Sequence, residues 1–322
     1  MMQGNQTIIT HFILLGFGEL HGMQMFLFHL FLIIYISTLL ANFLTVLLIL
    51  ADQHLHTPMY FFLGNLSCLE MMYSSTILPK MLDSLLTGEK SISFKGCITQ
   101  FYFFAFLCST ECYLLSVMSY DRFLAICKPL HYATAMRIAC CIQLAAVSWI
   151  NGTVFTSVYL VLMLQLSFCG PSEIDHFFCE SLPLIKLSCS DTTVMKYAVA
   201  VLAYTFTFPP FTLTFMSYMF ILKTILRIPS RTGRQKAFST CSSHLIVVSF
   251  FYGALAIVYL MPETEGKKNP SKLFSLLYTV LPSLFNPLIY TLRNKDVKEA
   301  LKNLLDRFWK TRFFSSHLKE IQ

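Results

Sequence analysis

The sequence predicts an all-α membrane protein, a seven-transmembrane helix bundle with a short amphipathic cytoplasmic helix. Composition is the first reason: of the 322 residues, 55% are hydrophobic and 13% are charged, whereas soluble domains contain about 25% charged residues. The second reason is that seven apolar segments are each long enough to cross about 30 Å of hydrocarbon. Backbone polar groups must be satisfied internally at that depth, so we expect helices.

The seven segments are separated by short polar connections. They cover Met25–Ala51, Pro58–Leu82, Cys97–Cys127, Ile138–Leu164, Val194–Leu226, Lys236–Met261 and Leu273–Leu292. The chain therefore divides into an N-terminal stretch (1–24), a transmembrane domain (25–292) and a tail (293–322). In the tail, apolar residues recur at helical spacing over Lys295–Trp309, which predicts a helix lying along an anionic membrane surface.

Basic residues predict the orientation of the bundle. Arg122, Lys128, Arg137 and most other Lys and Arg residues fall on one side of the predicted membrane. The positive-inside rule then places the N-terminus outside and the tail in the cytoplasm, as in a multi-pass plasma-membrane protein. The net charge is +7, but the basic residues lie in short loops and the tail, as orientation signals of a membrane protein do. We therefore expect membrane lipids as partners and no nucleic-acid partner. The N-glycosylation sequon at Asn5 lies on the outer side, so we expect it to be modified.

Eleven cysteines are present, and four of them lie in or beside the predicted extracellular loops. An even number in an oxidising compartment predicts two disulfides. The residues alone leave three pairings open for Cys97, Cys169, Cys179 and Cys189.

Polar residues inside the predicted spans indicate an interior network. Glu70 and Glu111 lie in the second and third spans, Asn42 in the first, and Asn286 precedes Pro287 in the seventh. Intramembrane charges are costly and usually face the bundle interior. Two nearby carboxylates repel unless one is protonated or a cation is shared. We therefore expect a monovalent cation such as sodium, or a proton, between Glu70 and Glu111; the alternative is structural hydrogen bonding alone. No other cofactor is expected.

A charged pair, Asp121-Arg122, closes the third span at its cytoplasmic end. Adjacent opposite charges can neutralise each other in an inactive state. An arginine released from such a pair can donate hydrogen bonds to the backbone carbonyls of a partner. The pair therefore favours a signalling function.

Enzyme motifs are missing from the sequence. It contains no nucleophile elbow, phosphate-binding loop or HExxH motif, so we do not expect an enzyme. His176, Cys179 and Glu180 form an HxxCE cluster in the second extracellular loop. A disulfide at Cys179 would consume the thiolate that a metal needs, so no metal site is expected there.

Five motifs occur in order along nearly the whole chain. They are Leu55–Leu63 (LHTPMYFFL), Met118–Cys127 (MSYDRFLAIC), Ser217-Tyr218, Lys236–Leu245 (KAFSTCSSHL) and Pro282–Tyr290 (PSLFNPLIY). With them, the sequence resembles an odorant receptor of the rhodopsin-like class, in its tetrapod-type (class II) branch.

The resemblance implies specific roles for residues. Disulfides would join Cys97 to Cys179 and Cys169 to Cys189. The residues implied in activation and G-protein coupling are Asp121, Arg122, Tyr218, His244, Asn286, Pro287 and Tyr290. Tyr252 replaces the tryptophan seen in many other rhodopsin-like receptors, as is typical of odorant receptors. The family further implies coupling to a heterotrimeric G protein of the stimulatory, olfactory type and a rise in cyclic AMP.

The sequence departs from the family pattern at a few positions. Glu70 stands where Asp is commoner, Ala41 precedes Asn42 where Gly is usual, and Ser119 and Phe123 replace the commoner Ala and Tyr. Glu70 keeps the charge but adds a methylene, which puts the geometry of a bound cation in doubt.

The family's pocket positions predict an apolar and aromatic binding site, part of which is helix-packing core. They correspond to Phe104, Ala105, Cys108, Ser109, Cys112, Leu202, Phe206, Tyr252, Leu255, Ala256, Tyr259, Leu276 and Thr279. No residue of this set is a cation or a carboxylate, so a small hydrophobic volatile with one hydroxyl, carbonyl or ether is expected rather than an amine or acid.

Two other functions fit parts of the sequence. A receptor for an endogenous metabolite outside the nose has the same sequence features, and only the tissue of expression separates the two. A channel or transporter would need a continuous polar path through the membrane, and the interior polar residues are too few to favour one.

Overall fold

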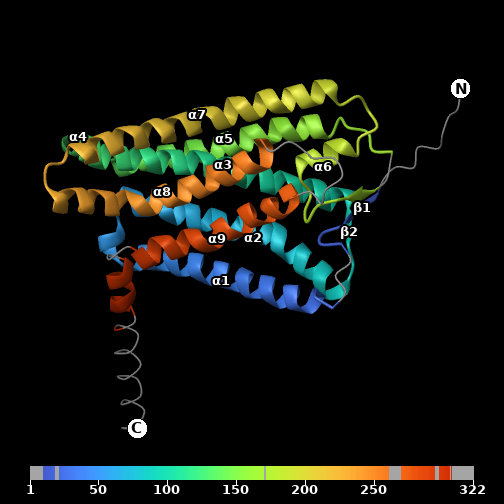
Figure 1. Cartoon of the computed structure of the whole chain (residues 1–322), viewed down its shortest axis with the longest axis horizontal. Helices are drawn as coiled ribbons and strands as arrows, with labels where there is room; N and C mark the ends of the chain where they lie inside the picture. Colours follow the sequence, from blue (N-terminus) through green and yellow to red (C-terminus); the bar gives the residue numbers. More distant parts are fainter. Residues whose placement is uncertain are drawn as a thin grey trace, which may run out of the picture.

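Long helices lie side by side in one bundle (Figure 1). The computed structural model describes residues 10–18, 22–169, 172–260, 270–293, 297–304 and 306. The long helices are α1 (Gln24–Ala51), α2 (Pro58–Thr87), α3 (Phe94–Cys127), α5 (Ile138–Met163), α7 (Thr193–Arg227), α8 (Arg231–Leu260) and α9 (Pro270–Arg293). The predicted seven-helix fold is confirmed.

Length and hydropathy alone identify some of these helices as able to cross a membrane. Within the described residues, α1, α3, α5 and α7 are long and apolar enough to cross a bilayer. A fifth candidate is α8, whose parts Arg231–Ser239 and Cys241–Ile257 meet at a 47° bend. Hydropathy does not select α2, which carries Glu70, Lys80 and Asp83. Helix α2 nevertheless packs within the bundle, against α1, α3 and α9.

Helix α3 is the central element of the bundle. It contacts α2, α5, α7 and α8, and 72% of its most apolar stretch is buried, against 11–22% in α1, α5 and α7. The outer helices instead expose large apolar side chains such as Ile33, Leu50, Val161 and Val201. Apolar side chains that face outward fit a lipid environment, because hydrocarbon does not penalise their exposure.

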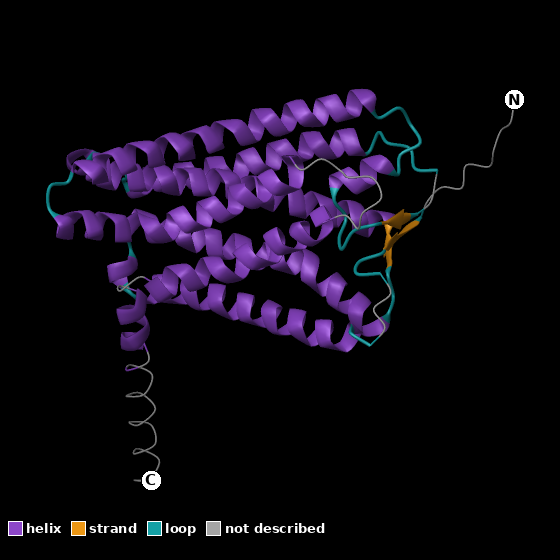
Figure 2. Ribbon diagram, in the orientation of Figure 1, coloured by secondary structure: helices purple, strands orange, loops and turns teal. Residues whose placement is uncertain are grey.

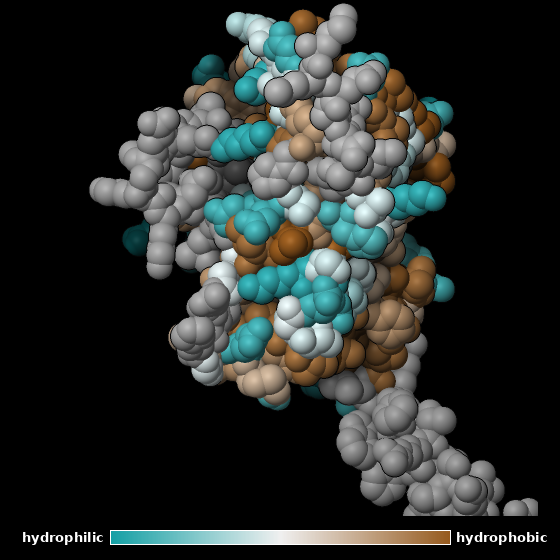
Figure 3. Space-filling view, turned by 90° about the vertical axis from the view of Figure 1, so that its right-hand side faces the viewer, coloured by the Kyte–Doolittle hydropathy of each residue, from teal (hydrophilic) through white to brown (hydrophobic). Residues whose placement is uncertain are grey.

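A small sheet covers one end of the bundle (Figure 2), here called the sheet end, and it has three strands in the described residues. Strand β1 (His11–Leu14) lies between β2 (Ser91–Ser93) and β3 (Glu173–Ile174). It is antiparallel to β2 and parallel to β3. Phe12 and Leu14 point inward and are buried, so the strand seals the bundle with two apolar side chains. Hydrophilic side chains gather on the outer face of this end (Figure 3).

Two disulfides fix the segment between α5 and α7 at the sheet end. Cys97 at the start of α3 bonds to Cys179, and Cys169 bonds to Cys189, with Cα–Cα distances of 5.4 and 5.9 Å. The buried side chain of Gln100 supports the first link: its Nε2 donates to the Thr76 carbonyl, and its Oε1 accepts from the Cys179 N–H, both at 3.0 Å. These are the pairings that the family resemblance implied.

Shorter helices connect the long ones. The 3₁₀ turn η1 (Gln53–Leu55) joins α1 to α2, α4 (Pro129–Ala135) joins α3 to α5 at the end opposite the sheet, and α6 (Ser181–Lys186) lies within the segment between α5 and α7. In the tail, 297–304 is helical, with Val297 and Ala300 buried and Lys298 and Lys302 exposed. The remainder of the predicted tail helix lies outside the described residues.

Candidate functional site

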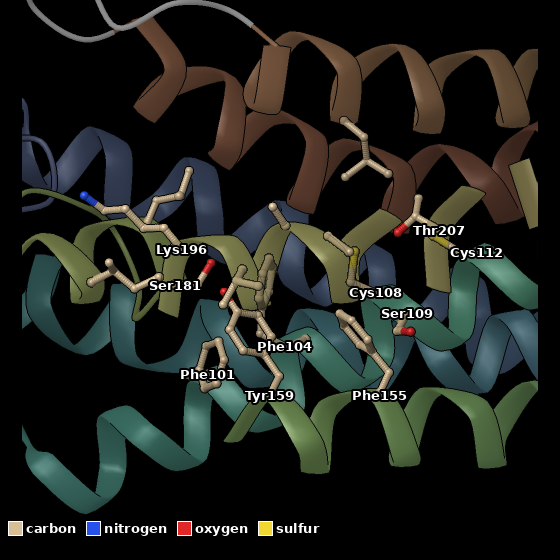
Figure 4. A pocket seen from close by; sticks show the side chains of 17 residues that line it. Phe101, Phe104, Cys108, Ser109, Cys112, Phe155, Tyr159, Ser181, Lys196 and Thr207 are labelled. Atoms are coloured by element: carbon tan, nitrogen blue, oxygen red, sulfur yellow. The ribbon is translucent and has the colours of Figure 1, made fainter. Parts of the chain in front are cut away.

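An apolar cavity of about 340 Å³ lies between α3, α5, α6 and α7 near the sheet end (Figure 4). Leu255 of α8 also reaches its wall. The cavity is lined by Phe101, Phe104, Ala105, Cys108, Ser109, Cys112, Phe155, Tyr159, Ser181, Leu182, Ile185, Lys196, Val199, Ala200, Ala203, Thr207 and Leu255. Its volume and apolar lining are typical of sites for small organic ligands.

Six residues of the sequence-based pocket line this cavity: Phe104, Ala105, Cys108, Ser109, Cys112 and Leu255. Five of them belong to α3. Their spacing of three and four residues places them on one face of that helix, which is the face turned toward α5 and α7.

Other residues of the sequence-based pocket lie elsewhere. Leu202 and Phe206 belong to α7, but the residues of α7 that line the cavity lie on a neighbouring face; Phe206 packs on Phe155, with ring centroids 5.1 Å apart. Tyr252 packs edge-on against Phe211 of α7.

Three further predicted positions also lie outside the cavity lining, and one is not described. Ala256 is exposed on α8. Leu276 and Thr279 are buried on α9, where Leu276 packs in an apolar cluster with Tyr73. The Tyr259 side chain lies outside the described residues.

Several lining residues were missed at the sequence level. Lys196, Val199, Ala200, Ala203 and Thr207 repeat at steps of three and four along α7, a periodicity that identifies one helix face. That signal was present in the sequence. No sequence signal placed Ser181, Leu182 and Ile185 of α6 in the wall, because α6 is brought there by the long-range disulfide at Cys179. Lys196 also adds a cation that the predicted set lacked.

An interior polar network joins α1, α2 and α9. Pro287 has no N–H, so the carbonyl of Ser283, four residues earlier, lacks its helical donor. The Asn42 side chain supplies one, with Nδ2 at 3.0 Å from that carbonyl. Asn286 in turn donates from Nδ2 to Glu70 Oε1 at 2.5 Å. Asn42, Glu70 and Asn286 are all buried.

Glu111 lies close enough to Glu70 for their charges to interact. Both carboxyl groups are buried, and neither Glu70 Oε2 nor Glu111 Oε1 has a hydrogen-bond partner among the described residues. Buried polar atoms are nearly always satisfied. Two orphaned carboxylate oxygens therefore suit a shared proton or a small monovalent cation.

At the end opposite the sheet, Asp121 is fully buried and holds two partners. The Arg122 guanidinium pairs with Oδ2, with Nε at 2.9 Å. The Tyr132 hydroxyl of α4 donates to Oδ1 at 2.9 Å. Burial and the adjacent Asp121 carboxylate raise the pKa of Tyr132 above its usual value, so this phenol keeps its proton and remains a donor. Arg122 is thus held within its own helix.

Tyr218 and His244 connect α7 to α8 at the same end. The Tyr218 hydroxyl and His244 Nδ1 are 2.6 Å apart, and both side chains are buried. The Tyr290 side chain, which was also predicted to take part in activation, lies outside the described residues.

The HxxCE cluster has a different role in the structure. Cys179 is disulfide-bonded, and His176 Nε2 lies 3.0 Å from Glu180 Oε2, with both side chains buried. Within the part of the chain that the structure describes, no group of three His, Cys, Asp or Glu side chains is arranged to hold a metal ion.

In the described part of the chain, seven long helices form a bundle with α3 at its centre, a ligand-sized cavity toward one end and an Asp–Arg pair at the other. This arrangement is that of a seven-helix membrane receptor. A sequence model of the family described as "Olfactory receptor" matches residues 31–307.

Most of the chain is also similar to curated olfactory receptors. It is 50% identical over 305 residues to Olfactory receptor 10A7 of Homo sapiens, covering 95% of this chain and 96% of the relative. It is 48% identical over 308 residues to Olfactory receptor 2B6 of Mus musculus, covering 95% and 98%. It is 45% identical over 305 residues to Olfactory receptor 5B21 of Homo sapiens, covering 95% and 98%. The chain belongs to the olfactory receptor family of G-protein-coupled receptors, which are not enzymes.

Proposed function

We propose that this receptor binds small, mostly hydrophobic volatile ligands in the cavity between α3, α5, α6 and α7, and that it activates a stimulatory, olfactory-type G protein to raise cyclic AMP. The observation that carries this proposal is the cavity itself. Its wall is formed mostly by aromatic and aliphatic side chains, with a few hydroxyls and thiols and with Lys196 near one end. A lining of this kind is suited to small, mostly hydrophobic molecules.

Apolar packing links the cavity to the Asp121-Arg122 end of the bundle. Cys112 lines the cavity and belongs to a continuous core cluster that includes Met118, Tyr218 and Val248. A ligand that shifts α3 relative to α8 acts on this cluster directly. In this proposal, the shift frees Arg122 from Asp121 so that the guanidinium can donate to carbonyls of the G protein.

In the proposed orientation, the sheet end faces outward at the plasma membrane and the tail is cytoplasmic. Two disulfides at the sheet end support this, because disulfides persist in oxidising compartments. Arg122, Lys128 and Arg137 at the other end support it through the positive-inside rule. Asn5, outside the described residues, would then be glycosylated, and the tail helix would contact anionic lipids.

We also propose that a sodium ion or a proton is shared between Glu70 and Glu111. The orphaned oxygens of both carboxylates support it. The shared sodium ion or proton would lie where α2, α3 and α9 meet. There it would stabilise the arrangement in which the two carboxyl groups lie close together.

A cyclic AMP assay with a chemically broad odorant panel tests the proposed function. Cells that express the receptor and the olfactory stimulatory G protein are expected to respond to a subset of neutral apolar compounds. Matched cells without that G protein are the control, and they should stay silent. The proposal would be contradicted if no neutral apolar compound activates a receptor that reaches the cell surface, or if responses persist without the G protein.

A further inference from the structure

The polar groups of the cavity wall are unevenly placed. Tyr159, Ser181 and Lys196 lie together at one end, and Cys108, Cys112 and Thr207 lie toward the other (Figure 4). The first three groups come from three separate elements, α5, α6 and α7. The end of the cavity that they share is therefore polar. None of these three residues was in the sequence-based pocket.

Tyr159 carries a polar group that a ligand in this cavity could bind. Its side chain is only 6% exposed, and its hydroxyl makes no hydrogen bond with the described residues, although it lies beside Ser181. A buried hydroxyl without a partner is uncommon in native proteins. An acceptor atom on a ligand in this cavity would satisfy it.

The side chains at this end are suited to a ligand group that accepts hydrogen bonds rather than to a cationic ligand group. Lys196 is exposed on α7, and its ammonium group on a flexible stem has three donors and no acceptor. Among the described lining residues there is no carboxylate. The nearby Glu180 is buried and paired with His176, so its charge is not available to a cationic ligand.

From this geometry we infer that the receptor's ligands consist of an apolar body ending in a carbonyl group, as in ketones, aldehydes and carboxylic acids. The carbonyl oxygen accepts hydrogen bonds from Tyr159 and Ser181 and faces the positive charge of Lys196. The body lies along Phe104 and Phe155 toward Cys112. This inference rests on the proposed function, because it assumes that agonists occupy this cavity. It includes carboxylic acids among the ligands, whereas the sequence-based pocket predicted no acidic ligand.

The test is a dose–response series with compounds of one chain length: an alkane, a 2-ketone, an aldehyde, a carboxylic acid and a primary amine. Wild-type receptor is expected to respond to the three carbonyl compounds at lower concentrations than to the alkane or the amine. Tyr159→Phe is expected to raise the half-maximal concentration for the carbonyl compounds by up to about tenfold, the effect of losing one hydrogen bond. The response to the alkane should not change.

Reversing the charge of Lys196 tests whether this residue acts on the ligand, because a purely structural role would not change the preference between an acid and an amine. Lys196→Glu is expected to weaken the response to the acid most and to improve the response to the amine. Matched controls are Tyr102→Phe, a half-buried tyrosine of α3 outside the cavity lining, and Lys95→Gln, an exposed lysine at the same end. Both should respond as wild type, and the surface level of every variant is measured.

The outcomes separate this inference from the proposed function. The inference is wrong, while the proposed function stands, if the alkane or the amine is as potent as the carbonyl compounds. It is also wrong if Tyr159→Phe leaves the half-maximal concentrations of the carbonyl compounds unchanged, or if Lys196→Glu does not weaken the response to the acid relative to the amine. Silence of the whole series and of the broad odorant panel, with the receptor at the surface, contradicts both.

Discussion

Replacing Arg122 with alanine is expected to lower agonist-induced cyclic AMP by more than about tenfold, while leaving surface expression largely intact. The guanidinium is held by Asp121 in this structure, and the proposed active form releases it to the G protein. A charge-assisted hydrogen bond contributes about 1.5–3 kcal/mol, and about 1.4 kcal/mol corresponds to a factor of ten. The measurement is cyclic AMP output normalised to surface receptor.

Two further variants make this result interpretable. Arg122→Ala leaves the buried Asp121 carboxylate with Tyr132 as its described partner, and an uncompensated buried charge is destabilising. The double variant Asp121→Asn with Arg122→Ala removes that charge and should be equally silent. Arg137→Ala changes an exposed arginine just before α5 and should signal normally. Full output from a surface-expressed Arg122 variant would contradict the assigned role.

Replacing Gly152 with valine is expected to prevent most of the receptor from reaching the cell surface. Gly152 lies where α5 crosses α3: a Cβ atom there would overlap Thr110 Oγ1 and come within 3.0 Å of the Phe106 carbonyl. Small residues allow membrane helices to approach this closely. Overpacking a tight contact costs about 1–3 kcal/mol, and backbone atoms cannot move aside as a flexible side chain can. Surface labelling and the thermal unfolding midpoint report the effect.

Gly253→Ala is the matched control, because a Cβ at that position meets no atom within 4 Å. Its surface level should equal that of the wild type. The milder Gly152→Ala should be partly rescued by Thr110→Ala, which removes the overlapping oxygen and leaves the 3.0 Å approach to Phe106. Normal surface levels of Gly152→Val would show that α3 and α5 do not pack as closely as the structure indicates.

Most of the helical fold could be predicted from the sequence, because long apolar segments have few alternatives in a membrane. The ends of the predicted apolar segments differ from the ends of the helices mainly where a helix continues beyond its apolar stretch. α2 runs on to Thr87 and ends at Gly88, whose positive φ of 77° favours glycine. Hydrophobicity marks the membrane boundary, whereas a helix ends where its backbone geometry changes.

The sheet end could not be predicted in the same way. Strand β1 has four residues, too few for its alternating burial to give a clear pattern. Its partners lie about 80 and 160 positions away, at Ile92 and Glu173. For the same reason the sequence-based pocket contained the α3 residues and missed α6, whose place depends on long-range disulfides and on pairing with distant segments.

The sequence predicted an interior polar network, and the structure shows two of its contacts, from Asn286 to Glu70 and from Asn42 to the Ser283 carbonyl. A proline within a helix frees one carbonyl, and a nearby asparagine is a suitable donor. The structure places Asn42 against the Ser283 carbonyl that Pro287 leaves free. The contact of Asn42 with this carbonyl follows from local chemistry, whereas the hydrogen bond between Asn286 and Glu70 depends on how α9 packs against α2.

In the proposed mechanism, agonists act from within the cavity beside α3. Filling the cavity is the most direct test: Ala105→Trp places a large side chain in its wall, and Ala146→Trp places the same side chain on the exposed face of α5. With both variants at wild-type surface levels, Ala105→Trp is expected to lose its cyclic AMP response to every agonist, while Ala146→Trp is expected to keep it. Undiminished responses in Ala105→Trp would show that the ligand binds elsewhere.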